Sequence, residues 1–168
     1  DRVGQIGFDP WATPTPCADW DVRTLVNHVV GEERWSVSLL AGATLEEVGD
    51  RFAGDVLGPE PTKAAREAAD EAARATTPPD LLDRTVHLSM GETPAREYLH
   101  QILAEHLVHG WDLAMALGSR PRLDPEAVRG CAAWFATRSG AYRADGLTRD
   151  ELTPPTDADE QDRLIAAF

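Results

Sequence analysis

Prolines and glycines divide the chain into long segments in which apolar residues recur at helical spacing, and this pattern limits the fold more than any other feature. Proline is excluded from a helix interior, and glycine favours the position just after a helix end. The pattern predicts four main helices, over residues 21–42, 61–75, 94–117 and 125–142, with Gly118 ending the third.

The segments between these helices carry weaker signals. Residues 10–20 contain three prolines and are predicted to form an extended arm, with Asp19 or Asp21 as the N-cap of the first helix. A short helix is expected around residues 45–53. An extended segment is expected near residues 85–88, in the connector that precedes the third helix.

The whole chain, residues 1–168, is expected to form one all-α domain. Its length and its 42% apolar residues suit a single core, and no strong alternating pattern predicts a sheet. Several amphipathic helices around one core favour an antiparallel helical bundle. Residues 151–168 are expected to form an acidic linker and a short C-terminal helix.

Charge and cysteine content exclude several classes of function. The chain has 16 Lys+Arg against 29 Asp+Glu, a formal net charge of −13, and its basic residues are scattered, so nucleic acid is not an expected partner. It has no apolar run of the length that spans a membrane. Cys17 and Cys131 form no CxxC pair, which favours a reducing cytoplasm, and Cys17 is expected to be a small buried apolar residue.

The third predicted helix carries three of the five histidines and two glutamates. Glu105 and His109 are one turn apart, so both side chains could hold one metal ion. His106 points into the centre of the apolar stripe, and His100 lies opposite His109. Glu97 and His100 form a Glu-x-x-His element, but a di-iron bundle needs two such elements facing inward, so the di-iron interpretation is rejected. The apolar stripe comprises Leu99, Ile102, Leu103, Leu113 and Leu117.

A third ligand could come from His28, on the apolar edge of the first helix, if the first and third helices pack antiparallel. Two imidazoles and one carboxylate would leave coordination positions open, which is typical of catalytic zinc, and nickel, iron and manganese also accept these ligands. Spacing alone leaves two alternatives. His106 with His109 fits the helical period as well as Glu105 with His109, and a lone histidine on an apolar face is more often a hydrogen-bonded core residue.

Five other residues have both a functional and an ordinary structural interpretation. Asp112 lies on the same side of its helix as the candidate glutamate, and either orients a metal ligand or is a solvated or capping residue. Trp35 and Trp111 either line a pocket or pack in the bundle. Arg84 and His87 either meet an anionic cosubstrate or are ordinary residues of the connector.

Two segments, PTPCADWDVRTLVNHVVGEERW and EHLVHGWDLAMALG, resemble the DinB/YfiT-like metal-binding superfamily. The closer resemblance is to its actinobacterial branch, which includes the N-terminal domain of mycothiol-dependent maleylpyruvate isomerase, and it extends to the terminal DEQDRL segment. The resemblance implies a DinB-like four-helix bundle with up-down-down-up topology and short extra helices. It also implies a metal held by His28, Glu105 and His109, with His106 outside the ligand set.

The resemblance also implies a helix before the arm, because the first bundle helix of that family precedes it. Only residues 1–8 remain of this helix here, so it is expected to be truncated. The isomerase carries an additional C-terminal domain, so the resemblance leaves the electrophilic substrate open.

The activity implied by the resemblance is that of a mycothiol-dependent S-transferase or isomerase in the cytoplasm. A divalent metal, most simply zinc, with nickel, iron or manganese as alternatives, would hold a mycothiol-like thiol as the thiolate that attacks an electrophile. The expected partners are a small-molecule thiol and an electrophile, with no nucleic acid or membrane, and the expected state is a monomer or homodimer. The alternatives are a metal- or small-ligand-binding module without turnover, and a structural bundle in which His28 and His109 are core residues.

Overall fold

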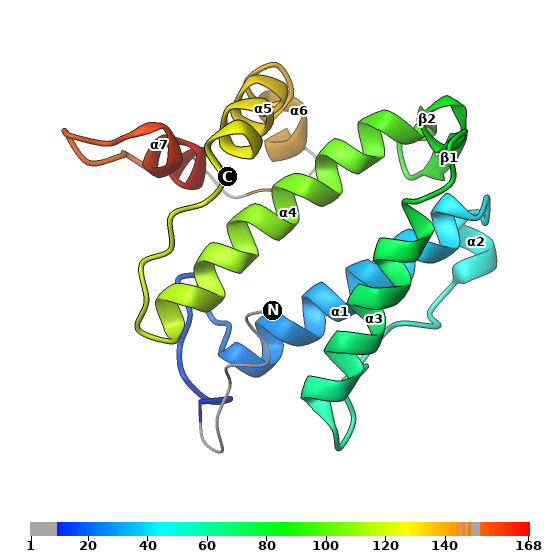
Figure 1. The fold of residues 1–168 in the computed structure, drawn as a ribbon, viewed down its shortest axis with the longest axis horizontal. Helices are drawn as coiled ribbons and strands as arrows, with labels where there is room; N and C mark the ends of the chain where they lie inside the picture. Colours follow the sequence, from blue (N-terminus) through cyan, green and yellow to red (C-terminus); the bar gives the residue numbers. More distant parts are fainter. Residues whose placement is uncertain (1–9, 145, 147, 149–151) are drawn as a thin grey trace.

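The computed structural model describes residues 10–144, 146, 148 and 152–168, and it shows a mostly helical fold with one small hairpin (Figure 1). The predicted remnant of a first bundle helix, at residues 1–8, lies outside the described residues. The predicted helical class is confirmed, but the fold also contains a two-stranded antiparallel sheet.

Helix α1 (Val22–Leu40) begins where the proline-rich arm ends, as predicted. Of the two predicted caps, Asp21 is the N-cap, since its Oδ1 accepts a hydrogen bond of 2.8 Å from the backbone N–H of Thr24. Asp19 instead takes a left-handed conformation with φ 65°. Backbone hydrogen bonds join the arm to the first residues of α1. The arm is therefore a fixed part of the fold.

Helices α2 (Leu45–Val48) and α3 (Pro61–Ala75) follow α1. Helix α3 has the predicted bounds, because Pro61 suits the first turn of a helix and the TTPP sequence stops it. Helix α2 is shorter than predicted, since Gly49 takes φ 58° and ends it after one turn. The face of α3 that packs along α1 buries small side chains, namely Ala64, Ala65 and Ala68.

A short helical turn, η2 (Leu81–Asp83), leads into a hairpin of β1 (Thr85–Leu88) and β2 (Gly91–Pro94). The predicted extended segment is β1. The sequence did not predict β2, because GETP lacks the alternating apolar residues of a half-buried strand. The strands pair antiparallel with Val86 opposite Thr93, both buried. Because β2 runs directly into the next helix, the hairpin fixes where that helix starts.

Helix α4 (Ala95–Ala116) is the long helix that the sequence predicts, and Gly118 follows its end with φ 75°. It lies between the other helices: α1 and α3 pack on one side, and the C-terminal helices pack on the other (Figure 1). Helices α1 and α4 run in opposite directions, as predicted. Helix α4 buries residues on several faces, so the prediction of a single stripe is wrong, and Leu103 is 38% exposed.

The predicted fourth helix is divided into α5 (Pro125–Ala136) and α6 (Ser139–Ala144). The prediction of one continuous helix is wrong because the side chains of Thr137 and Arg138 both donate to the Trp134 carbonyl, where the helical ladder would continue. The C-terminal segment forms the predicted short helix, α7 (Glu160–Ala167), which packs against α5.

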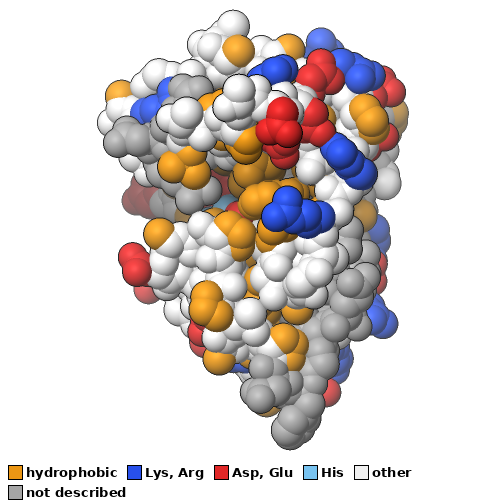
Figure 2. Space-filling view, turned by 90° about the vertical axis from the view of Figure 1, so that its left-hand side faces the viewer, with side chains coloured by type: hydrophobic (Ala, Val, Ile, Leu, Met, Phe, Trp, Pro, Cys, Tyr) orange, Lys and Arg blue, Asp and Glu red, His pale blue; other side chains and the backbone are white. Residues whose placement is uncertain are grey.

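The surface of the molecule carries a hollow bordered by hydrophobic side chains (Figure 2). One face of the molecule is hollowed near its middle, and hydrophobic side chains gather around the hollow, with charged side chains beside it (Figure 2). Hydrophobic surface that borders a hollow is typical of a site that receives a small molecule.

A polar anchor around Glu97 joins α4 to α5 and its following turn. The Glu97 carboxylate accepts a hydrogen bond of 2.8 Å from Trp134 Nε1 and is paired with the Arg138 guanidinium through two nitrogens. The guanidinium also lies over the Trp134 ring, 5.3 Å from its centroid. A charged acceptor is thus shared by two donors.

The substitution Glu97→Ala is expected to lower the free energy of unfolding by about 1–2 kcal/mol, because both donors lose a charged acceptor in a partly exposed position. Urea unfolding followed by circular dichroism measures this change. The matched control Glu71→Ala, at an exposed position of α3, is expected to change the same quantity by less than about 0.5 kcal/mol. Equal effects of the two substitutions would contradict the prediction.

Candidate metal centre

The three predicted metal ligands come from the two antiparallel helices. His28 projects from α1, and Glu105 and His109 project from successive turns of α4. The Oε2 atom of Glu105 is 3.1 Å from Nε2 of His109 and 3.8 Å from Nε2 of His28. All three potential ligand atoms lie within 4.8 Å of one another. Helix packing thus brings a histidine from a distant part of the chain to the i, i+4 pair.

These separations suit a first-row divalent cation. Metal–ligand bonds of about 2.0–2.2 Å in a tetrahedral site place neighbouring ligand atoms about 3.3–3.6 Å apart. The side chains of His28, Glu105 and His109 are 31, 21 and 12% exposed, so solvent reaches the group and further coordination positions would be open. The residues present therefore fit a divalent metal with an exchangeable ligand, and metal binding here stays a prediction.

The orientation of His109 is set by Asp112. The Nδ1 atom of His109 is 3.2 Å from Asp112 Oδ2, so the ring donates there and directs Nε2 toward Glu105. Asp112 has no exposed surface, which excludes the predicted alternative of a solvated residue. The thiol of Cys17 donates to the same carboxylate oxygen at 3.1 Å. Cys17 is half-buried and packs on the core between α1 and α3, as predicted in part, but its thiol is also a polar partner of Asp112.

Cys17, His109 and Asp112 form a second group whose potential ligand atoms lie within 4.8 Å of one another. Its position favours a supporting role over metal binding. The Asp112 carboxylate is fully enclosed, and the Nδ1 atom of His109 is already hydrogen-bonded. His28, Glu105 and His109 all line one cavity, whereas Asp112 of the second group does not, and we regard the first group as the candidate metal centre.

Strong electrostatic coupling links the two members of the i, i+4 pair. Burial favours the neutral form of Glu105, but hydrogen bonds from His109 and His28 outweigh it and lower the pKa of Glu105 to about 2. Burial likewise favours neutral His109, but hydrogen bonds to Asp112, Cys17 and Glu105 raise its pKa to about 11. A cation and the His109 proton therefore compete for the same space beside the Glu105 carboxylate.

A cavity of about 530 Å³ opens next to these three side chains, a size typical of small-molecule sites. Its other walls come from four parts of the chain: the arm, the facing sides of α1 and α4, Gly146 and Thr148 after α6, and Phe168. They include Cys17, Trp20, Glu32, Gln101, Val108 and Phe168. Small molecules could reach the open side of the candidate centre through this space.

Trp20 is the aromatic side chain of the cavity wall that lies against the candidate histidines, and the sequence analysis missed it. Its ring centroid lies 4.9 Å from that of His28 and 5.9 Å from that of His109. The two tryptophans that were considered pack elsewhere, since Trp35 contacts Phe52 and Trp111 packs with the core between α4 and α5. The signal was present in the sequence, because Trp20 closes the PTPCADW arm.

The other histidines of α4 have different partners. His106 does not point into the apolar core, since its side chain is 40% exposed and its Nε2 lies 3.3 Å from Glu33 Oε1. The Nδ1–H of His100 donates a hydrogen bond to the Arg96 carbonyl, and the His100 ring stacks on Trp134. Neither residue belongs to the groups of ligand atoms found among the described residues.

Two further candidates lie away from the cavity. The Arg84 guanidinium is paired with Asp80, and His87 stands opposite Glu92 in the hairpin. Neither lines the cavity beside the candidate centre. The Glu97 carboxylate is engaged by Trp134 and Arg138, which agrees with the rejection of a di-iron site.

Comparison with protein families gives a match that includes all three candidate ligands. The family model described as the mycothiol maleylpyruvate isomerase N-terminal domain matches residues 1–114, which is more than half of the chain. The chain belongs to this family. This membership is consistent with the DinB-like superfamily that the two sequence segments resemble. The match, residues 1–114, includes the arm and most of α4, so it contains the two helices that carry the candidate ligands.

Curated relatives of this family member come from two strains of Mycobacterium tuberculosis, and each is named as an uncharacterized protein. Each is 32% identical over 171 residues, covering 98% of this chain and 87% of the relative. No solved structure gives a significant match. Among the described residues, no helix combines the length and the apolar character needed to cross a bilayer.

Glu105→Gln and His109→Ala are each expected to reduce the bound divalent metal from about one per chain by about tenfold or more. The first substitution removes the negative charge of the carboxylate ligand, and the second removes the imidazole ligand. Elemental analysis after exposure to zinc and dialysis, on protein purified without a metal-binding tag, measures the content. His106→Ala is the matched control on the same helix and is expected to retain the metal. Loss of metal in His106→Ala with retention in Glu105→Gln would overturn the ligand assignment.

Metal affinity is expected to rise with pH through the neutral range, because an entering ion displaces the His109 proton, whose pKa is raised to about 11. At a pH below this pKa, each metal bound releases about one proton and affinity falls as the solution becomes more acidic. Isothermal titration with zinc from about pH 6 to about pH 8, in buffers of different ionisation enthalpy, counts the released protons. An affinity independent of pH in this range would contradict the expected competition.

Proposed function

We propose that this chain is a divalent-metal-dependent S-transferase or isomerase that uses a small-molecule thiol of the mycothiol type, with His28, Glu105 and His109 as metal ligands. The observation that carries the proposal is an open three-ligand group facing a cavity, in a chain of the mycothiol maleylpyruvate isomerase N-terminal domain family. The proposal includes zinc as the metal, a cytoplasmic location and the up-down-down-up four-helix topology.

When bound, a divalent ion would stabilise the thiolate of an incoming thiol, and the thiolate is the form that attacks electrophilic carbon. The residues of the chain prepare for this chemistry. Asp112 holds His109 in the tautomer that presents Nε2 to the centre. Trp20 covers the imidazoles on one side and limits the approach of water. The cavity leaves room for both reactants beside the candidate ligands.

The position of Cys17 favours a thiol from solution over one from the protein. Its Sγ atom lies 3.8 Å from Nδ1 of His109, and its thiol donates a hydrogen bond to Asp112. The candidate ligand atoms face the other edge of the same ring, toward Glu105. Cys131 is fully buried in the core between α4 and α5, and burial raises the pKa of its thiol to about 11. Cys17 lines the cavity, but its thiol is hydrogen-bonded to Asp112 on the far edge of the His109 ring from the candidate ligand atoms, so we expect the nucleophile to come from solution.

Turnover is expected to require an added thiol and to survive the double substitution Cys17→Ser, Cys131→Ala, because serine keeps a donor for Asp112 while removing the sulfur. The assay follows consumption of monochlorobimane, and separately of maleylpyruvate, by the zinc-loaded protein with and without mycothiol. His109→Ala is expected to abolish turnover while circular dichroism shows an unchanged helix content.

Three outcomes would contradict the proposal. Turnover without added thiol, or loss of turnover in the folded double cysteine variant, would assign the nucleophile to the protein. Consumption of neither electrophile while metal stays bound would favour a metal-binding module without catalysis. His100→Ala, a histidine of α4 outside the centre, serves as the matched control and is expected to retain activity.

A further inference from the structure

A further cavity, of about 190 Å³, lies where α1, α2 and α4 meet the turn of the β1–β2 hairpin. This hairpin cavity shares two lining residues, Glu32 and Gln101, with the cavity beside the candidate metal centre. The two cavities are therefore neighbours along the groove between α1 and α4. The other walls of the hairpin cavity are formed by Ser89, by Tyr98 and by apolar side chains, namely Trp35, Leu39, Leu45, Leu88 and Met90.

Helical periodicity aligns the hairpin cavity with the candidate metal ligands. On α1, Glu32 follows His28 by four residues. On α4, Gln101 precedes Glu105 by four residues, and Tyr98 precedes it by seven. Residues four and seven apart lie on the same face of a helix, and seven residues span about 10 Å. A ligand about 10 Å long could therefore have one end at the candidate centre and the other end in the hairpin cavity.

Three polar side chains of these walls have groups without a hydrogen-bond partner among the described residues. Tyr98 is only 5% exposed, and burial together with nearby carboxylates raises the pKa of its hydroxyl. The Gln101 amide oxygen accepts from the Tyr142 hydroxyl at 3.4 Å, but its N–H groups have no partner in the described part of the chain. The Glu32 carboxylate likewise has no donor there. Because a buried tyrosine hydroxyl normally has a partner, that of Tyr98 indicates a polar ligand in the cavity.

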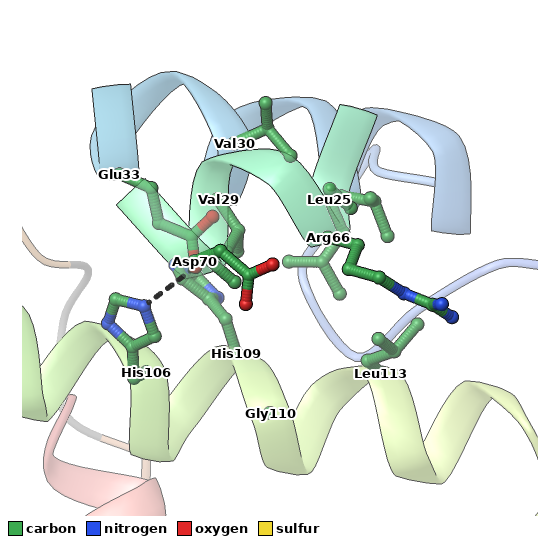
Figure 3. A pocket seen from close by; sticks show the side chains of 13 residues that line it. Leu25, Val29, Val30, Glu33, Arg66, Asp70, His106, His109, Gly110 and Leu113 are labelled. Atoms are coloured by element: carbon green, nitrogen blue, oxygen red, sulfur yellow. Dashed lines mark hydrogen bonds and ion pairs between the residues drawn. The ribbon is translucent and has the colours of Figure 1, made fainter. Parts of the chain in front are cut away.

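The adjacent glutamate of α1, Glu33, has a different environment from Glu32. Glu33 is 6% exposed, and its Oε1 lies 3.3 Å from Nε2 of His106 at the edge of an apolar cavity between α1, α3 and α4 (Figure 3). Its carboxylate is therefore compensated within the protein. Glu32 instead lines the groove, where burial raises the pKa of its carboxyl and no described side chain donates a hydrogen bond to it. Of the two carboxylates, that of Glu32 is the acceptor available to a ligand.

Hydroxyl groups match these three polar side chains. A carboxylate needs donors, an amide N–H needs an acceptor, and a phenol can act as either. A hydroxyl group both donates and accepts, whereas an ammonium group only donates and an ionised carboxylate only accepts. The charges of Glu32 and Glu105 would also repel an anion. The apolar walls of the hairpin cavity suit the carbon skeleton of the same molecule.

We infer that the hairpin cavity binds the uncharged, hydroxyl-bearing part of the thiol substrate, with Glu32, Tyr98 and Gln101 as specificity-determining residues. The identity of the ligand as a thiol rests on the proposed function, whereas the site rests on the unpaired polar groups and on the position of the cavity. The sulfur would lie at the candidate centre, and the rest of the molecule would extend along the groove toward the hairpin turn. A site that hydrogen-bonds substrate hydroxyls discriminates against analogues that lack them.

Isothermal titration of the purified, zinc-loaded full chain with two thioethers tests the inference. S-methyl mycothiol carries a hydroxyl-rich body and N-acetyl-S-methylcysteine lacks it, while the sulfur of both is blocked and cannot react. The first is expected to bind at about one per chain, and about tenfold or more tightly than the second. Tyr98→Phe and Glu32→Ala each remove a hydrogen-bonding group and are each expected to weaken binding of S-methyl mycothiol about fivefold.

Glu46→Ala is the matched control, because Glu46 is an exposed helical glutamate of α2 that lines neither cavity, and it is expected to change binding by less than about twofold. Tyr98→Phe keeps the buried ring and is expected to keep the zinc content of the wild type, which separates a lost ligand contact from a damaged centre. Equal binding of the two thioethers to the wild type, or unchanged binding of S-methyl mycothiol in folded Tyr98→Phe and Glu32→Ala, would overturn the inference.

The inference and the proposed function fail in different ways. Absence of turnover with weakened thioether binding in Tyr98→Phe would contradict the proposed function and support the site, since binding of a thioether requires no reaction. Turnover with mycothiol, together with equal thioether binding by the wild type and the two variants, would contradict the inference alone.

Discussion

Asp112 is a carboxylate without access to solvent, and hydrogen-bond donors reach only one of its oxygens: both bond to Oδ2, whereas Oδ1 has no hydrogen-bond partner among the described residues. Its donors come from two places, since His109 lies one turn earlier on α4 and Cys17 lies in the arm. Compensating Asp112 therefore holds the arm against α4 and also determines which nitrogen of His109 meets Glu105. Because the arm carries Trp20, the same interaction places the aromatic wall over the imidazoles.

The crossing of α1 and α4 separates two cavities of different chemistry. On one side, His28 and Glu105 face a cavity that also receives polar side chains such as Gln101 and Glu32. On the other side, valines of α1 and a glycine of α4 border an apolar cavity under α3. His109 is shared, so one imidazole ring forms part of the boundary between a polar and an apolar environment.

The helices could be predicted because their signals are local. Pro61 starts α3 and Asp21 caps α1 through residues that are neighbours in the sequence. The break between α5 and α6 could not be predicted in this way, since Arg138 is held by Glu97 from a different helix. Strand β2 was missed for a similar reason, because its pairing with β1, rather than its own composition, makes it a strand.

The candidate ligands show the same division between local and tertiary information. The i, i+4 spacing of Glu105 and His109 follows from one helix, whereas the approach of His28 depends on how α1 and α4 pack. Spacing alone did not decide whether Glu105 or His106 pairs with His109, and the family resemblance indicated Glu105. The contact between Cys17 and Asp112 joins residues far apart in the sequence, and neither residue carries a local signal of it.

The cavity beside the candidate centre has walls of two origins. The candidate ligands, the arm and the facing sides of α1 and α4 all lie within the part of the chain that matches the family model. Phe168, which packs on Phe135 of α5, forms another part of the wall from outside that match. Chains that share the first part but differ in the second would present the same donor atoms to differently shaped reactants. Selectivity in this architecture can therefore diverge without any change to the groups that perform the chemistry.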